Sequence, residues 1–516
     1  SSKLYFELAS SICNTHHAAM RILTCFLLLF GTSAWAASSG YGKSNFKNGR
    51  SVIVHLFEWT WNDIADECER FLGPYGFAGV QISPPSKQNK VTNPWRPWYE
   101  RYQPMSYELT SRSGDEADFR DMVERCRNVD VLIYVDAVIN HMAAMSYEYP
   151  GVPYYSEHFN VPRGNCPSSS GEMDYGNAIS VRNCNLVGLN DILFGSEVDY
   201  YTNQKVVDYL NKMIDIGVAG FRVDAAKHMW PGDLEDIVGE LWNTKDGSRP
   251  YVYQEVIDRS GNEAIKSWDY VHIGDVTEFK YCDQIVGLGH GTNQAKWFGN
   301  FGEAWGMMSS DHAFVFVDNH DNQRSHGGGG DILTYKDSWP YKKALAFGMA
   351  WDYGTFRIMS SFFFDDTDSS PPAYSDGTII SPTINSDGTC DGGWVCEHRW
   401  RQIRNMACFR NAAGWEPVEN WHDNGDNFIA FSRGNRAFFA INNQSYRVTS
   451  TLQTGLPAGE YCDVISGDPT NSGCAGTKIS VNSQGKASIS IHSGKDSMIA
   501  IHVGAKSGSG NTQCHW

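Results

Sequence analysis

Apolar runs rich in β-branched and aromatic residues alternate with segments of helical periodicity up to about Gly414. Trp61–Leu72 places its apolar residues on one helical face, Asp115–Arg127 begins with acidic residues in its first turn, and Thr202–Ile216 has the same periodicity. These three segments predict helices. The apolar runs between helical segments predict strands at Ser51–Phe57, Phe77–Ile82, Val131–Val135, Gly220–Val223, Tyr251–Gln254, Val276–Phe279, Ala313–Val317 and Phe356–Ser360.

Eight strands separated mainly by helices are typical of the α/β class and predict a closed parallel (β/α)8 TIM barrel. After the third strand, Asn140–Asp191 is rich in Gly, Pro, Ser and Tyr and is too long for a simple loop, so we expect an inserted irregular subdomain. Beyond about Gly414 the apolar runs have no helices between them. They predict a separate C-terminal antiparallel β domain with strands at Asn427–Ser432, Ala437–Asn442, Ala487–Ile491 and Met498–Val503.

The N-terminal segment has the pattern of a signal peptide. Met20 and Arg21 precede an apolar run over Ile22–Phe30, and Ala34–Ala36 forms a small-x-small cleavage site. A membrane anchor is the alternative, but the apolar run is too short to span a bilayer. We therefore expect a secreted protein whose mature chain starts near Ala37.

These patterns divide the chain into five parts. We expect an upstream segment and signal peptide over 1–36, a barrel over 37–139 and 192–414, an inserted subdomain over 140–191, a C-terminal β-sandwich over 415–504 and a flexible tail over 505–516. The sequence has 13 cysteines, of which Cys13 and Cys25 precede the predicted cleavage site. Secretion favours disulfides, and the eleven remaining cysteines leave at least one unpaired.

Composition narrows the classes of partner. The net charge of −17 disfavours nucleic acid and anionic membranes, because phosphate groups would be repelled. The 17 tryptophans and an aromatic content of 13% suit a surface on which sugar rings stack, although a large core would use the same residues. The hydrophobic content of 41% is that of a globular protein.

Polar residues of particular types follow four of the predicted barrel strands. Strand three ends at Asp136, strand four runs into Asp224, strand five into Glu255, and strand seven into Asp318–Asp321. Reactive groups of barrel enzymes lie where the strands end, and like charges gathered there repel one another and lose hydration. Glycoside hydrolysis needs two carboxyl groups, and a third can orient the sugar. The pattern therefore indicates a glycoside hydrolase.

Four segments resemble the signature blocks of the α-amylase family, glycoside hydrolase family 13. They are Asp136–His141 (DAVINH), Gly220–His228 (GFRVDAAKH), Tyr253–Val256 (YQEV) and Phe316–Asp321 (FVDNHD), in the family's order and spacing. Asn93–Pro104 (NPWRPWYERYQP) and Lys227–Asp233 (KHMWPGD) look like the animal-type members. The resemblance covers roughly Gly49 to Val503.

The resemblance implies endo-hydrolysis of α-1,4-glucosidic bonds in starch and glycogen with retention of the anomeric configuration, by a secreted enzyme that we expect to be monomeric. By matching position, Asp224 would be the nucleophile, Glu255 the acid/base and Asp321 the stabiliser of the distorted sugar. Residues matching substrate contacts, for malto-oligosaccharides as well as starch, are Trp98, Tyr99, Tyr102, Gln103, His141, Arg222, Lys227, His228, His320 and His326.

The resemblance also implies two ions. A structural Ca²⁺ would be held between the inserted subdomain and the barrel by the Asn140 side chain, the Arg182 carbonyl, Asp191 and the His228 carbonyl, a set of oxygen donors that suits this ion. An activating Cl⁻ would be held by Arg222, Asn319 and Arg357. The alternative for Arg357 is a structural salt bridge.

The family pattern would pair Cys68 with Cys126, Cys166 with Cys184, Cys390 with Cys396 and Cys462 with Cys474, leaving Cys282, Cys408 and Cys514 unassigned. Two other functions stay open on the residues alone. A glucan transferase of the same family would use the same carboxylates, and its products would be rearranged chains. A non-catalytic carbohydrate-binding relative would typically lack one carboxylate, and all three are present here.

Overall fold

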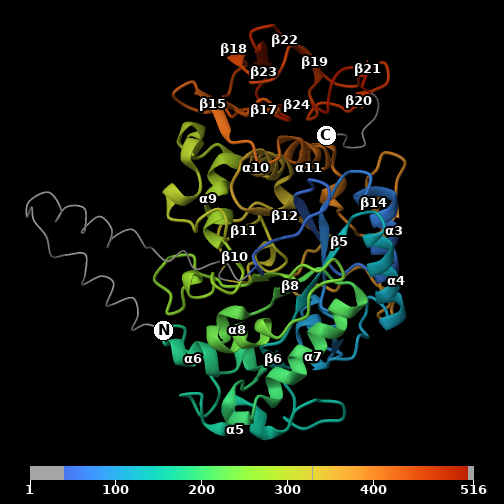
Figure 1. The fold of residues 1–516 in the computed structure, drawn as a ribbon, viewed down its shortest axis with the longest axis vertical. Helices are drawn as coiled ribbons and strands as arrows, with labels where there is room; N and C mark the ends of the chain where they lie inside the picture. The colour runs from blue at the N-terminus through green and yellow to red at the C-terminus, as the bar shows by residue number, and fades with distance from the viewer. Residues whose placement is uncertain (1–39, 328, 510–516) are drawn as a thin grey trace, which may run out of the picture. The chain divides into compact units, whose positions relative to one another are not determined.

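The computed structural model describes residues 40–327 and 329–509, which centre on a closed barrel of eight strands (Figure 1). The strands are parallel and follow the order β1-β12-β11-β10-β9-β8-β5-β2. Every predicted barrel strand is confirmed. These strands were predictable because a strand covered on both faces has a continuous apolar sequence. Their bounds are β1 (Val52–Leu56), β2 (Gly79–Ile82), β5 (Leu132–Ala137), β8 (Gly220–Val223), β9 (Tyr251–Gln254), β10 (Asp275–Thr277), β11 (Ala313–Val315) and β12 (Thr355–Ser360).

Helices follow most of the barrel strands. The three predicted helices are present, and the helices around the barrel bury apolar residues in the same core as its strands. They are α3 (Trp61–Glu67), α4 (Glu116–Arg127), α7 (Tyr201–Ile216), α8 (Pro231–Gly239), α9 (Phe279–His290), α10 (Ser338–Ala350) and α11 (Arg401–Ala413).

The first predicted helix differs from its expected form. It is α-helical only to Glu67 and continues as a π-helical turn over Cys68–Leu72, where the Gly73 amide donates to the Cys68 carbonyl at 2.8 Å. Apolar spacing does not distinguish the two helix types over so short a segment. Cys68 in this turn is bonded to Cys126 of α4.

The segment between β5 and β8 leaves the barrel as an irregular insertion. It contains α5 (Asn160–Arg163), α6 (Ala178–Asn183) and an antiparallel pair of two-residue strands, β6 (His141–Met142) and β7 (Asn190–Asp191). The disulfide between Cys166 and Cys184 closes the insertion internally. The pairing of β6 with β7 brings the two ends of the insertion together, with Asp191 opposite His141.

The C-terminal residues form the expected antiparallel β domain. The four predicted strands correspond to β16 (Phe428–Arg433), β17 (Ala437–Asn442), β23 (Lys486–Ile491) and β24 (Met498–His502). Strands that the apolar pattern did not predict complete it: β15 (Val418–Asp423), β18 (Val448–Gln453), β19 (Gly459–Cys462) and β22 (Lys478–Val481). β15 has only exposed and half-buried residues, and most residues of β18 are exposed or half-buried too, so their apolar signal is weak.

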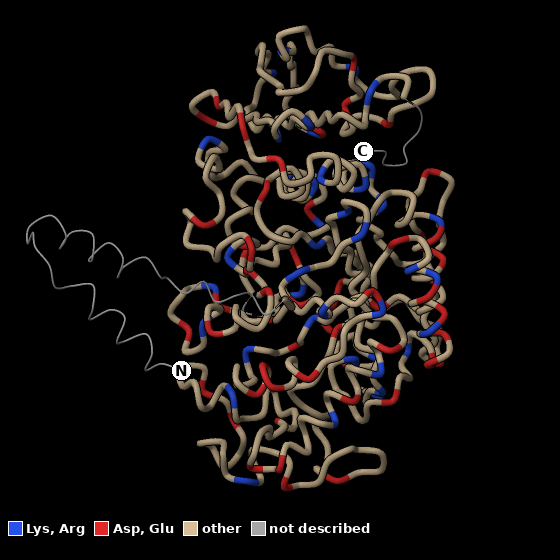
Figure 2. Tube along the Cα trace, in the orientation of Figure 1, with Lys and Arg blue, Asp and Glu red and all other residues tan. Residues whose placement is uncertain are grey.

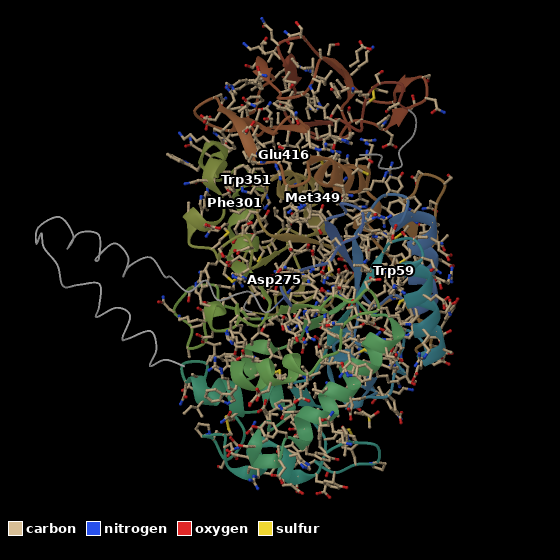
Figure 3. All side chains as sticks on the ribbon, in the orientation of Figure 1. Trp59, Asp275, Phe301, Met349, Trp351 and Glu416 are labelled. Carbon is tan, nitrogen blue, oxygen red and sulfur yellow. A yellow bond between two sulfur atoms is a disulfide. The ribbon has the colours of Figure 1, made fainter. Side chains whose placement is uncertain are left out.

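Aromatic residues join this domain to the barrel helices. Trp351, which follows α10, donates its indole N–H to the Phe301 carbonyl at 2.8 Å, and both lie in the region labelled in Figure 3. The Trp351 ring packs edge-on against Phe431 of β16 at 5.3 Å. Ala505, in the predicted tail, accepts a hydrogen bond from the Cys462 amide at 2.8 Å, so the start of that tail is tied to β19.

The four disulfides implied by the family pattern are all present. Cys408 also forms a disulfide, and Cys282 is free and buried. The predicted signal peptide, Cys514 and the end of the tail lie outside the described residues. Acidic and basic residues are interspersed along the described trace (Figure 2). None of the helices within 40–327 and 329–509 is both long and apolar enough to cross a bilayer.

Candidate active site

The carboxyl ends of neighbouring barrel strands bring three carboxylates onto one guanidinium. Arg222 and Asp224 are two residues apart on β8 and its extension, so both point into the barrel. The Arg222 Nη1 lies 2.5 Å from Asp136 Oδ1 and 2.9 Å from Asp224 Oδ1, and its Nη2 lies 2.6 Å from Glu255 Oε1. The second Glu255 oxygen accepts from the Ala225 amide at 2.9 Å.

Burial makes ionisation of this cluster costly. Asp224 is 6% exposed and Glu255 is 8% exposed. Burial raises the pKa of Asp224 well above its usual value against the opposing charge of Arg222, and nearby Glu255 adds to the rise. The pKa of Asp321 is raised to about 7 by burial and then by the charge of Glu255. Asp224 and Asp321 therefore hold their protons to higher pH than isolated carboxyls do.

Aromatic and imidazole rings form the wall next to the carboxylates. Tyr102 donates its hydroxyl to Asp136 Oδ2 at 2.8 Å, and its ring stacks on His320 at 5.0 Å with an interplanar angle of 7°. His320 lies 3.3 Å from Asp321 through its Nε2. Burial and then the charge of Arg222 lower the pKa of His320 well below its usual value, so its ring is neutral and can donate one hydrogen bond.

The carboxylates open into a cleft of 1020 Å³. The predicted site residues that line it are Trp98, Tyr99, Tyr102, Gln103, His141, Asp224, Lys227, His228, Glu255, His320, Asp321 and His326. Arg222 is 1% exposed and lies beneath the carboxylates rather than on the cleft wall. Three carboxylates contact its guanidinium from the side of the cleft, and its predicted contact with substrate stays a prediction.

A second group of cleft residues is not among those predicted from the sequence. Tyr175, Leu186, Val187 and Leu189 come from the insertion and form an apolar wall, and Ile257, Arg259 and Glu263 come from the loop after β9. None belongs to a signature block. The feature that marks this wall is the exposure of apolar residues such as Val187, which is 85% exposed. That exposure can be seen in the structure and not in the sequence.

Lys227 and His228 are fixed by backbone carbonyls. Lys227 Nζ donates to the Ile257 carbonyl at 2.6 Å, and the His228 Nδ1 lies 2.9 Å from the Val181 carbonyl in α6. Burial lowers the pKa of His228 to about 4, so the ring is neutral in ordinary buffers. His228 thus links the cleft to the insertion.

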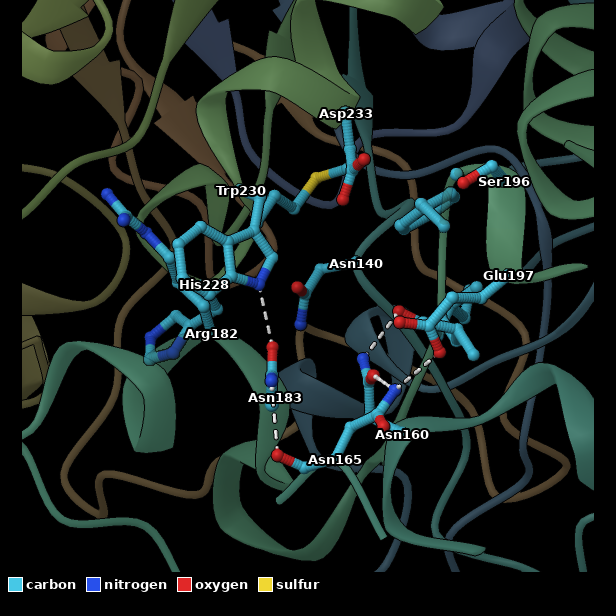
Figure 4. A pocket seen from close by; sticks show the side chains of 15 residues that line it. Asn140, Asn160, Asn165, Arg182, Asn183, Ser196, Glu197, His228, Trp230 and Asp233 are labelled. Carbon is cyan, nitrogen blue, oxygen red and sulfur yellow. Dashed lines mark hydrogen bonds between the residues drawn. The ribbon is translucent and has the colours of Figure 1, made fainter. Parts of the chain in front are cut away.

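The predicted calcium residues gather where the insertion meets the barrel. Asn140, Arg182 and His228 line a polar hollow (Figure 4), and Asp191 is bound beside it by Asn160, whose Nδ2 donates at 2.7 Å. Asp191 is buried, and its Oδ1 has no hydrogen-bond partner among the described residues. Burial raises the pKa of Asp191 well above its usual value.

These donors fit a hard cation. A buried carboxylate with an unused oxygen is costly unless a cation or proton neutralises it. The predicted set offers one carboxylate together with amide and carbonyl oxygens, and across 40–327 and 329–509 no three His, Cys, Asp or Glu side chains are placed to share a metal. That oxygen-rich composition suits Ca²⁺ rather than a transition metal. The Arg182 guanidinium instead packs over the Trp230 ring at 4.8 Å, which leaves its carbonyl as the donor.

The predicted chloride residues include a guanidinium without a carboxylate. Arg357 on β12 is 1% exposed, and its Nη1 donates to Gln81 Oε1 at 2.9 Å. Its Nε and Nη2 have no hydrogen-bond partner among the described residues, and no salt bridge to it occurs there. Asn319 caps the following turn by accepting from the Asp321 amide at 3.0 Å. The unused donors of Arg357 fit a small anion.

Comparisons with known proteins agree with this geometry. The family model of the α-amylase C-terminal all-beta domain matches residues 418–504. The chain is 50% identical to alpha-amylase 2B of Homo sapiens over 93% of this chain and 99% of that protein, and 51% identical to the pancreatic alpha-amylase of Sus scrofa over 89% and 96%. Alpha-amylase I of Eisenia fetida, solved as a mutant with maltohexaose, has a TM-score of 0.84 at 44% identity, over 90% of this chain and 99% of that one.

The barrel and its buried carboxylate cluster define a glycoside hydrolase. The relatives identify which one: the chain belongs to the α-amylase family, with the animal enzymes among its similar members, and it is an α-amylase by class.

Proposed function

We propose that the protein hydrolyses internal α-1,4-glucosidic bonds of starch, glycogen and malto-oligosaccharides by a retaining double displacement. Asp224 is the nucleophile, Glu255 the acid/base, and Asp321 stabilises the distorted sugar. The observation that carries the proposal is the contact of both Asp224 and Glu255 with the Arg222 guanidinium. Two carboxyls held this close are the arrangement of retaining rather than inverting glycosidases.

In the first step an Asp224 oxygen attacks the anomeric carbon while Glu255 gives its proton to the glycosidic oxygen, so the bond between C1 and that oxygen breaks. In the second step water attacks the same carbon, passes a proton to Glu255 and releases Asp224. Arg222 favours the ionised form of Asp224 through its 2.9 Å contact. The Ala225 amide fixes the orientation of Glu255.

The cleft walls hold the sugar chain during both steps. Trp98, Tyr99 and Tyr102 offer ring faces, and the neutral imidazole of His320 donates to a sugar hydroxyl. His141 lines the same wall and donates its ring N–H to the Tyr102 carbonyl at 3.0 Å. Asp321 lies 3.3 Å from His320, which positions it to stabilise the positive charge that develops on the sugar. His326, Lys227, His228 and Gln103 complete the polar lining.

We also propose that Asn140, Arg182, Asp191 and His228 hold a structural Ca²⁺ and that Arg222, Asn319 and Arg357 hold Cl⁻. When bound, calcium would brace the insertion and chloride would favour the protonated form of nearby acids. The orphaned oxygen of Asp191 and the unused donors of Arg357 support these assignments. The domain bounds at 140–191 and 415–504, secretion of a mature chain beginning near Ala37, and a monomeric state belong to the same proposal.

The test is digestion of soluble starch by wild type and by Asp224→Asn and Glu255→Gln, with products separated. Asp224→Asn should lower kcat at least about 10³-fold, because the attacking oxyanion is lost, and Glu255→Gln should be nearly as damaging. Asp236→Asn, an exposed acid on α8, is the matched control and should keep wild-type activity. Retention of more than about a tenth of the activity in Asp224→Asn would remove the nucleophile assignment. Branched or lengthened products would indicate a transferase.

A further inference from the structure

A second hollow, of 560 Å³, lies outside the cleft lining described above. Phe363 and Phe364, which follow β12, form one side, and Tyr335 and Lys336, which follow β11, form the other. Asp366 and Ser369 close the rim. The hollow therefore combines aromatic rings with a few polar groups, the composition of a small-molecule site.

This hollow and the cleft share a wall. The Arg324 guanidinium lies 5.6 Å from the Trp98 ring, which faces the cleft, and 4.1 Å from the Phe364 ring, which faces the hollow. The Trp98 indole N–H also donates to the Thr367 carbonyl at 2.8 Å. The segment that forms the hollow is thus fixed directly to the cleft wall.

The strand that the hollow follows determines at which end of the cleft the hollow lies. β12 and β8 are four strands apart in the closed order of eight, so the segments that follow them lie on opposite sides of the barrel mouth. Lys227 follows β8, whereas Phe363 follows β12. A glucan that crosses the carboxylates and leaves the cleft past Trp98 and Tyr99 therefore runs toward the hollow and away from Lys227.

The chemistry of the hollow favours a neutral polyhydroxylated ligand. The Phe363 ring is 59% exposed and is held edge-on by Tyr335 at 5.5 Å, so one flat apolar face stays open. Lys336 is placed over the Phe364 ring at 3.8 Å, and Asp366 adds a carboxylate to the same lining. Carboxylate, hydroxyl and ammonium groups around an aromatic face match the hydroxyls and the C–H face of a sugar.

We propose that this hollow is an outer subsite, in which Phe363 stacks on a glucose unit of the same α-1,4-glucan that is cleaved at Asp224. The inference rests on the proposed function and adds to it a residue that selects for longer chains. A short oligosaccharide that fills only the central cleft does not reach Phe363.

The experiment compares kcat/KM for maltoheptaose with kcat/KM for maltotriose. Phe363→Ala should lower the ratio of the two about fivefold, the size of one lost aromatic stacking contact. Phe363→Leu keeps the apolar volume without the flat face and should lower the ratio similarly, whereas Phe363→Tyr should preserve it. Tyr374→Ala is the matched control, since Tyr374 is 60% exposed on the same segment and does not line the hollow, and it should leave the ratio unchanged.

A ratio within twofold of wild type in both Phe363→Ala and Phe363→Leu would overturn the subsite, and so would an equal fall in Tyr374→Ala. Melting curves of the variants check that the fold is intact, as the exposure of Phe363 leads us to expect. Failure of the subsite leaves wild-type cleavage and its loss in Asp224→Asn untouched. Failure of the proposed function would instead appear as full activity in Asp224→Asn.

Discussion

Two buried guanidiniums have opposite surroundings at the barrel mouth. Arg222 contacts Asp136, Asp224 and Glu255, so carboxylates balance its charge. Arg357 has Gln81 as a polar partner, and burial lowers its pKa, with the charge of Arg222 acting in the same direction. A buried cation without a counter-charge is costly, which is why an anion beside Arg357 would stabilise the folded protein.

The chloride assignment predicts an activity profile that depends on one residue. Chloride should raise the rate of wild type and move the alkaline limb of the pH–rate profile to higher pH, because a bound anion disfavours ionisation of a nearby acid. Arg357→Gln should remove most of this response and keep activity at lower pH. The measurement is starch hydrolysis across pH with chloride or with a poorly binding salt at equal ionic strength. Identical wild-type profiles in the two salts would refute the anion site.

The residues of the site differ in how far sequence could identify them. Asp224, Glu255 and Asp321 follow apolar runs whose ends are recognisable, so their meeting at one mouth was predictable from barrel topology. Val187 and Arg259 reach the cleft from irregular segments, where neither periodicity nor strand position fixes the direction of a side chain. Phe363 lies just beyond the strand predicted at Phe356–Ser360, and no sequence pattern marks it. Its exposure depends on how the loop after β12 packs against Trp98.

At the scale of elements, the insertion between β5 and β8 has little regular secondary structure. Its helices α5 and α6 are short, and its ends are joined by the two-residue pair of β6 and β7. Asp191 lies in that pair with an unused buried oxygen. The sequence predicted an insertion because no helical or strand periodicity continues through this segment. For the same reason, its short helices and strands could not be predicted.

Removal of calcium should therefore loosen this element first. Excess chelator should lower the Tm of wild type and speed proteolysis within 140–191, because an ion that binds only the folded state stabilises it by mass action. Asp191→Ala should reproduce both effects without chelator. Glu172→Ala, an exposed acid in the same segment, is the control and should behave as wild type. A Tm of Asp191→Ala equal to that of wild type, with calcium present, would contradict the site.

Across the whole molecule, one buried cluster joins early and late parts of the barrel. Glu67 of α3 lies 2.9 Å from His398 Nε2 and also pairs with Arg399, while His398 Nδ1 lies 2.9 Å from the Ser360 hydroxyl of β12. Ser360, His398 and Glu67 are fully buried, so this Ser-His-Glu series has no access to substrate and acts as a structural contact.

This contact predicts a stability change in acid. Burial opposes ionisation of Glu67, but hydrogen bonds and charge from His398 and Arg399 outweigh it and lower the pKa to about 2 from 4.5. A carboxyl whose pKa is lower in the folded than in the unfolded protein stabilises the fold at pH values above its unfolded pKa. That stabilisation is lost as the pH falls through the folded pKa, here between about pH 4.5 and 2. The loss amounts to about 3 kcal/mol of unfolding free energy. The Tm difference between wild type and Glu67→Gln should shrink over this range. Glu108→Gln, which changes an exposed carboxylate, is the control, and its Tm should equal that of wild type at each pH. A constant Glu67→Gln difference down to pH 2 would contradict the assignment.

The double displacement at Asp224 is tested most directly by the configuration of the first product. Proton NMR during hydrolysis of a malto-oligosaccharide distinguishes the two anomers before they equilibrate. Two successive inversions at the same carbon, first by Asp224 and then by water, predict that the α-anomer forms first. If the β-anomer forms first, water attacks directly, Asp224 is not a nucleophile, and the assignment of roles to the two carboxyls on Arg222 is wrong.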